Sequence, residues 1–237
     1  MENRPKEPSK ELDLSKVKYV ISDWDGTFVD SQEPYSDAFG RMMNQNFQVD
    51  FKKAKDYYIE TFGMTLVDQV RGAAQKFAKE TVVDTSPFEN IFWDSQLESG
   101  YPPQEIDGAR QTLEYLKENG YTVIIWSGSR TDFLGKKLEE TGFSKFVDFY
   151  IGNQPGSETL VKGPGLFREI AKHFQVTEEQ LRDQSVALGD AQSDIEAGKS
   201  CNIPSIGVVK TTTAENLKKL GADYVIEQIG DLSSLLK

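Results

Sequence analysis

The stretch VKYVISDWDGT at residues 17–27 is a short apolar run that ends in two aspartates, Asp23 and Asp25, directly before Gly26 and Thr27. We expect a buried strand that carries two carboxylates to the point where the backbone turns. Carboxylates so close together are costly unless a cation lies between them. The stretch therefore suggests a metal site and an acid beside a nucleophile, although a helix N-cap followed by a turn would use the same residue types.

The bulk composition excludes several classes of protein. The 237 residues carry a net charge of −11, which argues against a general nucleic-acid or anionic-membrane surface. No apolar run approaches the ~18 residues of a membrane span, and the charged N-terminal residues do not resemble a secretory signal. Cys201 is the only cysteine, so no internal disulfide can form and a reducing, cytoplasmic location is expected.

Apolar runs alternate with amphipathic segments along most of the chain. Six runs predict strands, at residues 17–22, 121–127, 146–151, 185–189, 205–209 and 224–226. Five segments between these runs predict helices, at residues 105–119, 131–141, 165–174, 193–200 and 213–220. This alternation predicts an α/β fold, in which a Rossmann-like parallel sheet has helices on both faces.

One region breaks the alternation. Residues 34–99 show no clear strand and read as several amphipathic helices, far more chain than a strand-to-strand crossover needs. We expect a helical cap domain inserted after the first strand and lying over the carboxyl edge of the sheet. The predicted organisation is a mobile N-terminal tail at 1–13, a core domain at 14–32 and 101–237, and the cap at 33–100.

Three later segments place polar residues where strands end. Ser127 and Gly128 follow the second long apolar run, and a hydroxyl beside small residues at a helix start can bind an anion. Lys162 precedes a proline, and Asp190 and Asp194 follow the run at 185–189. Each segment also has an ordinary structural explanation: a helix N-cap for the serine, a solvated charge for the lysine, and a favourable helix dipole for the aspartates.

Together, the four segments in this order resemble the haloacid dehalogenase-like superfamily, in its phosphatase branch with a helical cap after the first strand. Phosphoglycolate phosphatases and β-phosphoglucomutases are examples of that branch. The resemblance covers residues 17 to 236 and is carried by Asp23-x-Asp25-Gly26-Thr27, Ser127, Lys162 with Pro164, and Gly189-Asp190-x-x-x-Asp194, with lesser support from Asp30-Ser31 and Tyr101-Pro102.

The resemblance implies roles for four catalytic residues. Asp23 would be the nucleophile and form an aspartyl-phosphate, and Asp25 would be the acid for the leaving alcohol and then the base for water. Ser127 would hydrogen-bond the phosphoryl group, and Lys162 would neutralise Asp23 and the transferring phosphoryl. A covalent intermediate would divide one difficult displacement into two easier ones.

The same resemblance implies a Mg²⁺ cofactor. Its ligands would be Asp23, the main-chain oxygen of Asp25, Asp190 and Asp194, an all-oxygen set that suits a hard cation. We also expect contacts to the substrate phosphate from Gly26, Thr27, Gly128 and Arg130. Gly26 is expected to offer its N–H to the anion, and Arg130 follows the Ser127 turn.

The predicted function is a Mg²⁺-dependent phosphatase that acts on a small phosphorylated metabolite, such as phosphoglycolate or a sugar phosphate. The main alternative is a phosphotransferase of the β-phosphoglucomutase type, and a dehalogenase, a phosphonatase and a non-catalytic binding module are weaker ones. The protein is expected to be a monomer or a homodimer. Trp24 departs from the family pattern, and Cys201 is expected to pack as a small apolar side chain rather than act as a nucleophile.

Overall fold

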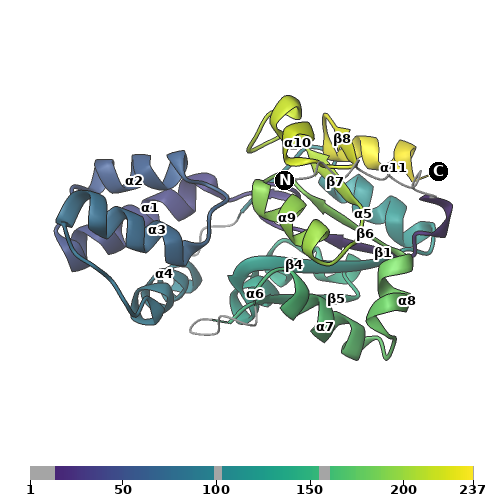
Figure 1. The fold of residues 1–237 in the computed structure, drawn as a ribbon, viewed down its shortest axis with the longest axis horizontal. Coiled ribbons are helices and arrows are strands. Elements are labelled where there is room, and N and C mark those ends of the chain that lie inside the picture. Colours follow the sequence, from purple (N-terminus) through teal and green to yellow (C-terminus); the bar gives the residue numbers. More distant parts are fainter. Residues whose placement is uncertain (1–13, 99–102, 155–160, 237) are drawn as a thin grey trace, which may run out of the picture.

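The structure is a computed structural model that describes residues 14–98, 103–154 and 161–236. The tail predicted at residues 1–13 and the Tyr101-Pro102 pair lie outside the described residues. The fold is α/β, with a parallel sheet on one side and a group of helices on the other (Figure 1). Within the described residues, no helix combines the length and the apolar character needed to cross a bilayer.

The centre of the fold is a six-stranded sheet in the order β5-β4-β1-β6-β7-β8, and every neighbouring pair is parallel. This order places β1 between β4 and β6, so the three strands that carry the motifs are adjacent. The strands are β1 (Tyr19–Ser22), β4 (Thr122–Arg130), β5 (Phe149–Asn153), β6 (Ser185–Gly189), β7 (Ser205–Val208) and β8 (Tyr224–Ile226).

Helices cover both faces of this sheet, as the alternation predicts. Strand residues alternate between two apolar clusters, with Val20 and Val123 in one and Ile21 and Ile124 in the other. The first cluster packs under α5 (Ala109–Glu118), α6 (Thr131–Glu140) and α11 (Leu232–Leu235), and the second under α7 (Pro164–His173), α8 (Glu178–Asp183) and α9 (Gln192–Ser200). Helix α10 (Ala214–Leu220) packs beside α9, β7 and β8.

A separate helical lobe follows the first strand and stands beside the sheet (Figure 1). Its cap helices are α1 (Gln32–Phe47), α2 (Phe51–Glu60), α3 (Leu66–Ala73) and α4 (Ser86–Glu98), with a π-helical turn at Ala74–Ala78. They share an apolar cluster of their own, which also takes in Phe133 from α6. A short antiparallel ribbon, β2 (Val29–Asp30) with β3 (Gln104–Glu105), joins the two connections between lobe and sheet.

Among the predicted boundaries that differ from the structure, two near the site are wrong for local reasons. The helix predicted from residue 105 begins at Ala109, because Gly108 takes a positive φ of 83° and the residues before it pair with β2. The strand predicted to end at Ser127 continues to Arg130 with an irregularity in its pairing to β5. Ser127 therefore does not stand at a helix start, and α6 begins only at Thr131.

Trp24, the departure from the family pattern, has a packing role. Its side chain is buried and meets the ring of Phe143 edge to face at 5.6 Å, with Phe28 next to it. Its carbonyl oxygen accepts from the N–H groups of Phe28 and Val29 as the chain turns. The indole therefore turns into the core, while the aspartates on either side of it face the site.

Candidate active site

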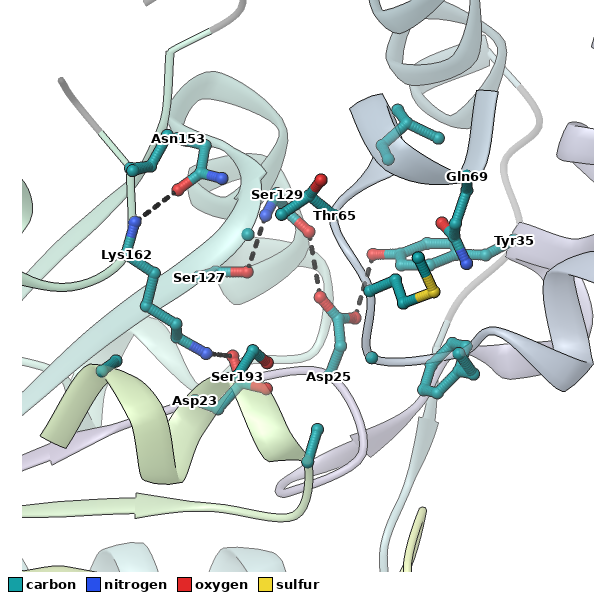
Figure 2. Close-up of a pocket in the computed structure, with 18 of the residues that line it drawn as sticks. Asp23, Asp25, Tyr35, Thr65, Gln69, Ser127, Ser129, Asn153, Lys162 and Ser193 are labelled. Atoms are coloured by element: carbon teal, nitrogen blue, oxygen red, sulfur yellow. Dashed lines mark hydrogen bonds and ion pairs between the residues drawn. The ribbon is translucent and has the colours of Figure 1, made fainter. Parts of the chain in front are cut away.

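The carboxyl ends of β1, β4 and β6 meet at one edge of the sheet, facing the cap helices (Figure 1). A cavity of about 420 Å³ lies at this edge. Asp23, Asp25, Ser127, Lys162 and Asp190 line it from the side of the sheet, and Tyr35, Tyr58, Gln69 and Trp93 are among the cap residues that line it from the other side. Figure 2 shows Tyr35, on the cap side, turned toward Asp25 on the side of the sheet.

Lys162 joins two of the carboxylates. Its Nζ lies 2.6 Å from Oδ1 of Asp23 and 2.5 Å from Oδ1 of Asp194, and all three side chains are nearly buried. Its main-chain N–H donates to Oδ1 of Asn153, which fixes the turn before α7 (Figure 2). Burial alone would lower the pKa of Lys162, but Asp194 and Asp23 outweigh burial and raise it, so the ammonium keeps its charge.

A buried group of three carboxylates forms the acidic centre of the site. Asp23, Asp190 and Asp194 each offer one oxygen, and these oxygens lie within 4.8 Å of one another. Burial and the neighbouring carboxylates raise the pKa of Asp23 well above its usual range, against the opposing effect of Lys162. Burial, with Asp194 adding to it, raises the pKa of Asp190 to about 7.

The same three residues fit a divalent cation. One ammonium group is too little charge for three buried carboxylates, so a further cation would relieve their mutual repulsion. Carboxylate oxygens are also the donors that a hard cation such as Mg²⁺ prefers. The arrangement satisfies the chemical requirement for the predicted metal.

Asp25 is held by one residue from the cap and one from the core. Its Oδ1 accepts from the hydroxyl of Tyr35 on α1, and its Oδ2 accepts from the hydroxyl of Ser129 on β4, each at 2.9 Å (Figure 2). Burial raises the pKa of Asp25, and the hydrogen bonds from Ser129 and Tyr35 work against that rise. The carboxyl group is therefore fixed in orientation and still able to carry a proton.

The end of β4 forms another part of the cavity wall. Ser127 is buried, and its Oγ accepts from the N–H of Ser129 at 3.0 Å. Gly128 between them is exposed to the cavity, and a Cβ added there would meet no atom within 4 Å. This leaves room above the backbone of Gly128 for a group that binds at the end of the strand.

The positions of Gly26 and Thr27 differ from the prediction. The N–H of Gly26 donates to the carbonyl of Val29 at 2.8 Å, so it is not presented to an anion. The hydroxyl of Thr27 is buried and donates to Oδ1 of Asp190 at 3.2 Å. The N–H of Thr211 donates to the other oxygen of Asp190. Gly26 and Thr27 therefore pack against and orient Asp190, and neither lines the cavity.

Arg130 also differs from the prediction. Its guanidinium lies 2.7 Å from Asp94 on α4 and 2.6 Å from Asp132 at the start of α6. The contact with Asp94 ties the core to the cap, and Arg130 is not among the residues that line the cavity. The side chain that the sequence suggested as an anion contact therefore acts as a bridge between the two parts of the molecule.

Sequence reasoning missed Tyr35, Ser129 and Asn153 as members of the site. Tyr35 falls at helical spacing with Phe39, so the pattern indicates only a core position. Asn153 lies two residues beyond the strand predicted at 146–151, and the Lys162 that it orients comes nine residues later. The contacts of these residues depend on tertiary structure, and only Ser129, two residues after Ser127, had a local signal.

Comparison with known proteins identifies the family. The haloacid dehalogenase-like hydrolase family matches residues 20–208. This chain belongs to that family. The match spans the four motif segments and confirms the resemblance and the fold class predicted from them.

Similar proteins cover nearly the whole chain. The pyrophosphatase PpaX of Listeria innocua is 24% identical over 94% of this chain and 97% of its own length. The phosphoglycolate phosphatase of Pseudomonas putida is 24% identical over 92% of this chain and 78% of its own length. A crystal structure described as a predicted phosphatase from Clostridium acetobutylicum has a TM-score of 0.79 at 20% identity, and covers 93% of this chain and 98% of its own. The predicted enzyme class, a phosphatase among these hydrolases, agrees with these relatives.

Proposed function

We propose that the protein is a Mg²⁺-dependent phosphatase that hydrolyses a small phosphomonoester through an aspartyl-phosphate. The observation that carries the proposal is the buried group of Asp23, Asp190 and Asp194, with Lys162 against two of its members, at the mouth of a cavity that also holds Asp25. A nucleophile, an acid, a fixed cation and a metal-binding set are the parts that phosphoryl transfer needs.

Asp23 is the proposed nucleophile. One of its carboxylate oxygens would form a bond to phosphorus while the bond from phosphorus to the ester oxygen breaks, and the alcohol leaves. Water would then attack the phosphorus of the aspartyl-phosphate and release inorganic phosphate and the free carboxylate. Lys162, 2.6 Å from Asp23, supplies a fixed positive charge beside the transferring group.

Asp25 is the proposed proton carrier. It would give its proton to the ester oxygen as that oxygen leaves, and take a proton from the attacking water in the second step. Tyr35 and Ser129 hold the carboxyl group, which fixes where the proton is delivered. Ser127 and Gly128 are proposed to contact the phosphoryl oxygens at the end of β4.

Mg²⁺ is the proposed cofactor. Asp23, Asp190 and Asp194 would hold it, together with the main-chain oxygen of Asp25. When bound, it would offset the charge of the carboxylates and let the phosphate dianion approach Asp23. Thr27 and the N–H of Thr211 keep Asp190 in place for this role.

The domain division predicted from the sequence is part of the proposal. Residues 14–32 and 101–237 would act as the catalytic core, and residues 33–100 as the cap that closes over the substrate and selects it. The enzyme would act in the cytoplasm on a phosphorylated metabolite, in keeping with a lone buried cysteine.

The test is hydrolysis of p-nitrophenyl phosphate with Mg²⁺ and with a chelator. We expect activity only with Mg²⁺, and its loss in Asp23→Asn. The matched control is Asp56→Asn, which removes an exposed carboxylate from the cap and should leave activity unchanged. Full activity in Asp23→Asn would overturn the mechanism, and transfer of phosphate to a second sugar instead of water would favour the mutase alternative.

A further inference from the structure

The cap side of the cavity is mostly aromatic and apolar. Six of the residues that line it from the cap are Tyr58, Phe62, Met64, Leu66, Phe92 and Trp93. They face the proposed nucleophile and acid across the cavity, so they surround the space where the leaving group of a phosphate ester would lie. Burial of apolar surface is the main attraction that such a wall can offer to a ligand.

The polar groups on the same side are neutral. Gln69 is buried, and its Nε2 donates to the carbonyl and the hydroxyl of Thr61 at 3.1 and 3.2 Å. Burial raises the pKa of Tyr58, so its hydroxyl stays protonated and uncharged. These groups can accept or donate a hydrogen bond, but they cannot balance an ionic charge on the ligand.

Lys162 is the one cation among the described residues that line this cavity, and two carboxylates already engage it. The internal stretches at 99–102 and 155–160 contain no lysine or arginine in the sequence. Arg71 and Lys219 line neighbouring depressions instead. Arg71 donates to the carbonyl of Val83, and Lys219 pairs with Glu215.

The remaining charges around the cavity are negative. Asp25 stands between the phosphate end and the cap, and Glu196 lines the cavity from α9. A carboxylate or a second phosphate on the leaving group would lose its hydration shell among the apolar side chains. It would also be repelled by Asp25 and Glu196, with no cation to pair with it. Unpaired charges and like-charge contacts of this kind weaken recognition of a ligand.

We propose that this phosphatase selects phosphate monoesters whose leaving group is uncharged and at least partly apolar or aromatic, and that it discriminates against esters with a second anionic group. This inference rests on the proposed function, because it assigns the aromatic cap wall to the leaving group of that reaction. It sets the chain apart from the relatives named above, whose names describe pyrophosphate and phosphoglycolate as substrates.

The test uses pairs of esters that differ only in charge. One pair is 4-carbamoylbenzyl phosphate and 4-carboxybenzyl phosphate, and the other is the phosphate ester of glycolamide and phosphoglycolate. Phosphate release with Mg²⁺ is measured for each, and kcat/KM is compared within each pair. We expect the neutral member to be preferred by about tenfold or more in both pairs.

A change of charge in the wall provides a second measurement. Met64 is 50% exposed, so Met64→Lys should fold normally and place a cation at the cavity. It should raise kcat/KM for the carboxylated esters and reduce the preference for the neutral ones several-fold. Ile59→Lys is the matched control, because Ile59 is an exposed cap residue outside the three depressions.

The outcomes separate the two proposals. Equal or faster hydrolysis of the carboxylated esters would overturn the inference and leave the phosphatase assignment standing. An unchanged preference in Met64→Lys would contradict the assignment of this wall to the leaving group. If neither the four esters nor p-nitrophenyl phosphate releases phosphate with Mg²⁺, the proposed function itself fails.

Discussion

The hydroxyl of Tyr35, on the first cap helix, donates a 2.9 Å hydrogen bond to Oδ1 of Asp25, just beyond the first strand of the sheet. Ser129 holds the other oxygen of the same carboxyl group from β4. The proposed proton carrier is therefore positioned jointly by the cap and the core. This gives the cap a direct connection to the proposed chemistry, besides its proposed contact with the leaving group.

Tyr35→Phe should impair hydrolysis most where the leaving group needs a proton. Loss of one hydrogen bond to Asp25 should lower kcat for benzyl phosphate by about five- to tenfold. p-Nitrophenolate leaves without protonation, so hydrolysis of p-nitrophenyl phosphate should change much less. The measurement is the ratio of kcat for the two esters.

Tyr121→Phe is the control for that experiment. It also removes a tyrosine hydroxyl that hydrogen-bonds, because Tyr121 donates to the carbonyl of Leu236 far from the site. Its ratio of kcat values should equal that of the unmodified protein. Equal effects of Tyr35→Phe on both esters would show that Tyr35 does not act through Asp25.

Lys162→Met should lower both the phosphatase activity and the unfolding free energy. It leaves Asp23 and Asp194 without their nearest cation in a buried setting, which typically costs about 3–5 kcal/mol of unfolding free energy. Loss of the fixed charge beside the phosphoryl group should lower kcat by about a hundredfold or more. Urea unfolding and p-nitrophenyl phosphate turnover measure the two effects.

The matched change is Lys210→Met. Lys210 pairs with Asp30 at 2.8 Å, but both side chains are about 40% exposed. A pair in that setting contributes less than about 1 kcal/mol, and kcat should not change. A Lys162→Met protein as stable and active as Lys210→Met would contradict the role given to Lys162.

Asp190→Asn should separate metal binding from folding. In a chelator the variant should unfold at a higher temperature than the unmodified protein, because it removes one of three clustered carboxylates. Each 1 kcal/mol corresponds to about 2–4 °C for a domain of this size. Mg²⁺ should raise the unfolding temperature of the unmodified protein and have little effect on the variant. An equal Mg²⁺ effect on both would exclude Asp190 as a ligand.

The fold, and the meeting of the motif residues at one cavity, could be predicted from the sequence because both depend on local signals. Apolar runs mark the strands, and glycines that follow amphipathic segments mark the ends of helices. The parallel sheet then brings the carboxyl ends of the strands to one edge. Asp23, Ser127 and Asp190 follow three such runs, so their meeting at the cavity follows from topology. Lys162 precedes the proline that opens α7, which places it at the same edge.

Contacts between distant segments could not be predicted in this way. Tyr35 has the spacing of a core residue. Its hydrogen bond to Asp25 depends on the direction in which the chain runs from β1 into α1. Gly26 and Thr27 have the composition of an anion-binding turn. In the structure the chain folds back, so the N–H of Gly26 donates to the carbonyl of Val29 and the hydroxyl of Thr27 donates to Asp190. Arg130 donates to Asp94, 36 residues earlier in the sequence, and does not line the cavity.

Cys201 should be unreactive in the folded protein. The residue is 3% exposed, and burial raises the pKa of its thiol to about 11. At pH 8 the thiolate is then about one part in a thousand, and the thiolate is the species that reacts. Labelling with a thiol-specific disulfide reagent should be slow in buffer and rapid in urea.

The same thiol should affect alkaline stability. Its pKa is higher in the folded protein than in the unfolded chain, so the unfolded state loses the proton first as the pH rises. Its titration should therefore lower the unfolding free energy between about pH 9 and pH 11, and Cys201→Ala should remove that loss. Rapid labelling of the folded protein at pH 8 would contradict the burial of Cys201.

Gly26→Ala and Gly120→Ala should show that Gly26 makes room for Asp190. Both glycines have a positive φ, 81° and 79°, so alanine introduces similar backbone strain of about 1–2 kcal/mol at each. A Cβ at Gly120 meets nothing within 4 Å, whereas a Cβ at Gly26 overlaps the carboxylate of Asp190.

Gly120→Ala should therefore keep full activity and its Mg²⁺-induced rise in unfolding temperature. Gly26→Ala should lose both, because Asp190 is displaced from Asp23 and Asp194. Equal Mg²⁺ responses in the two variants would mean that the metal does not depend on the position of Asp190.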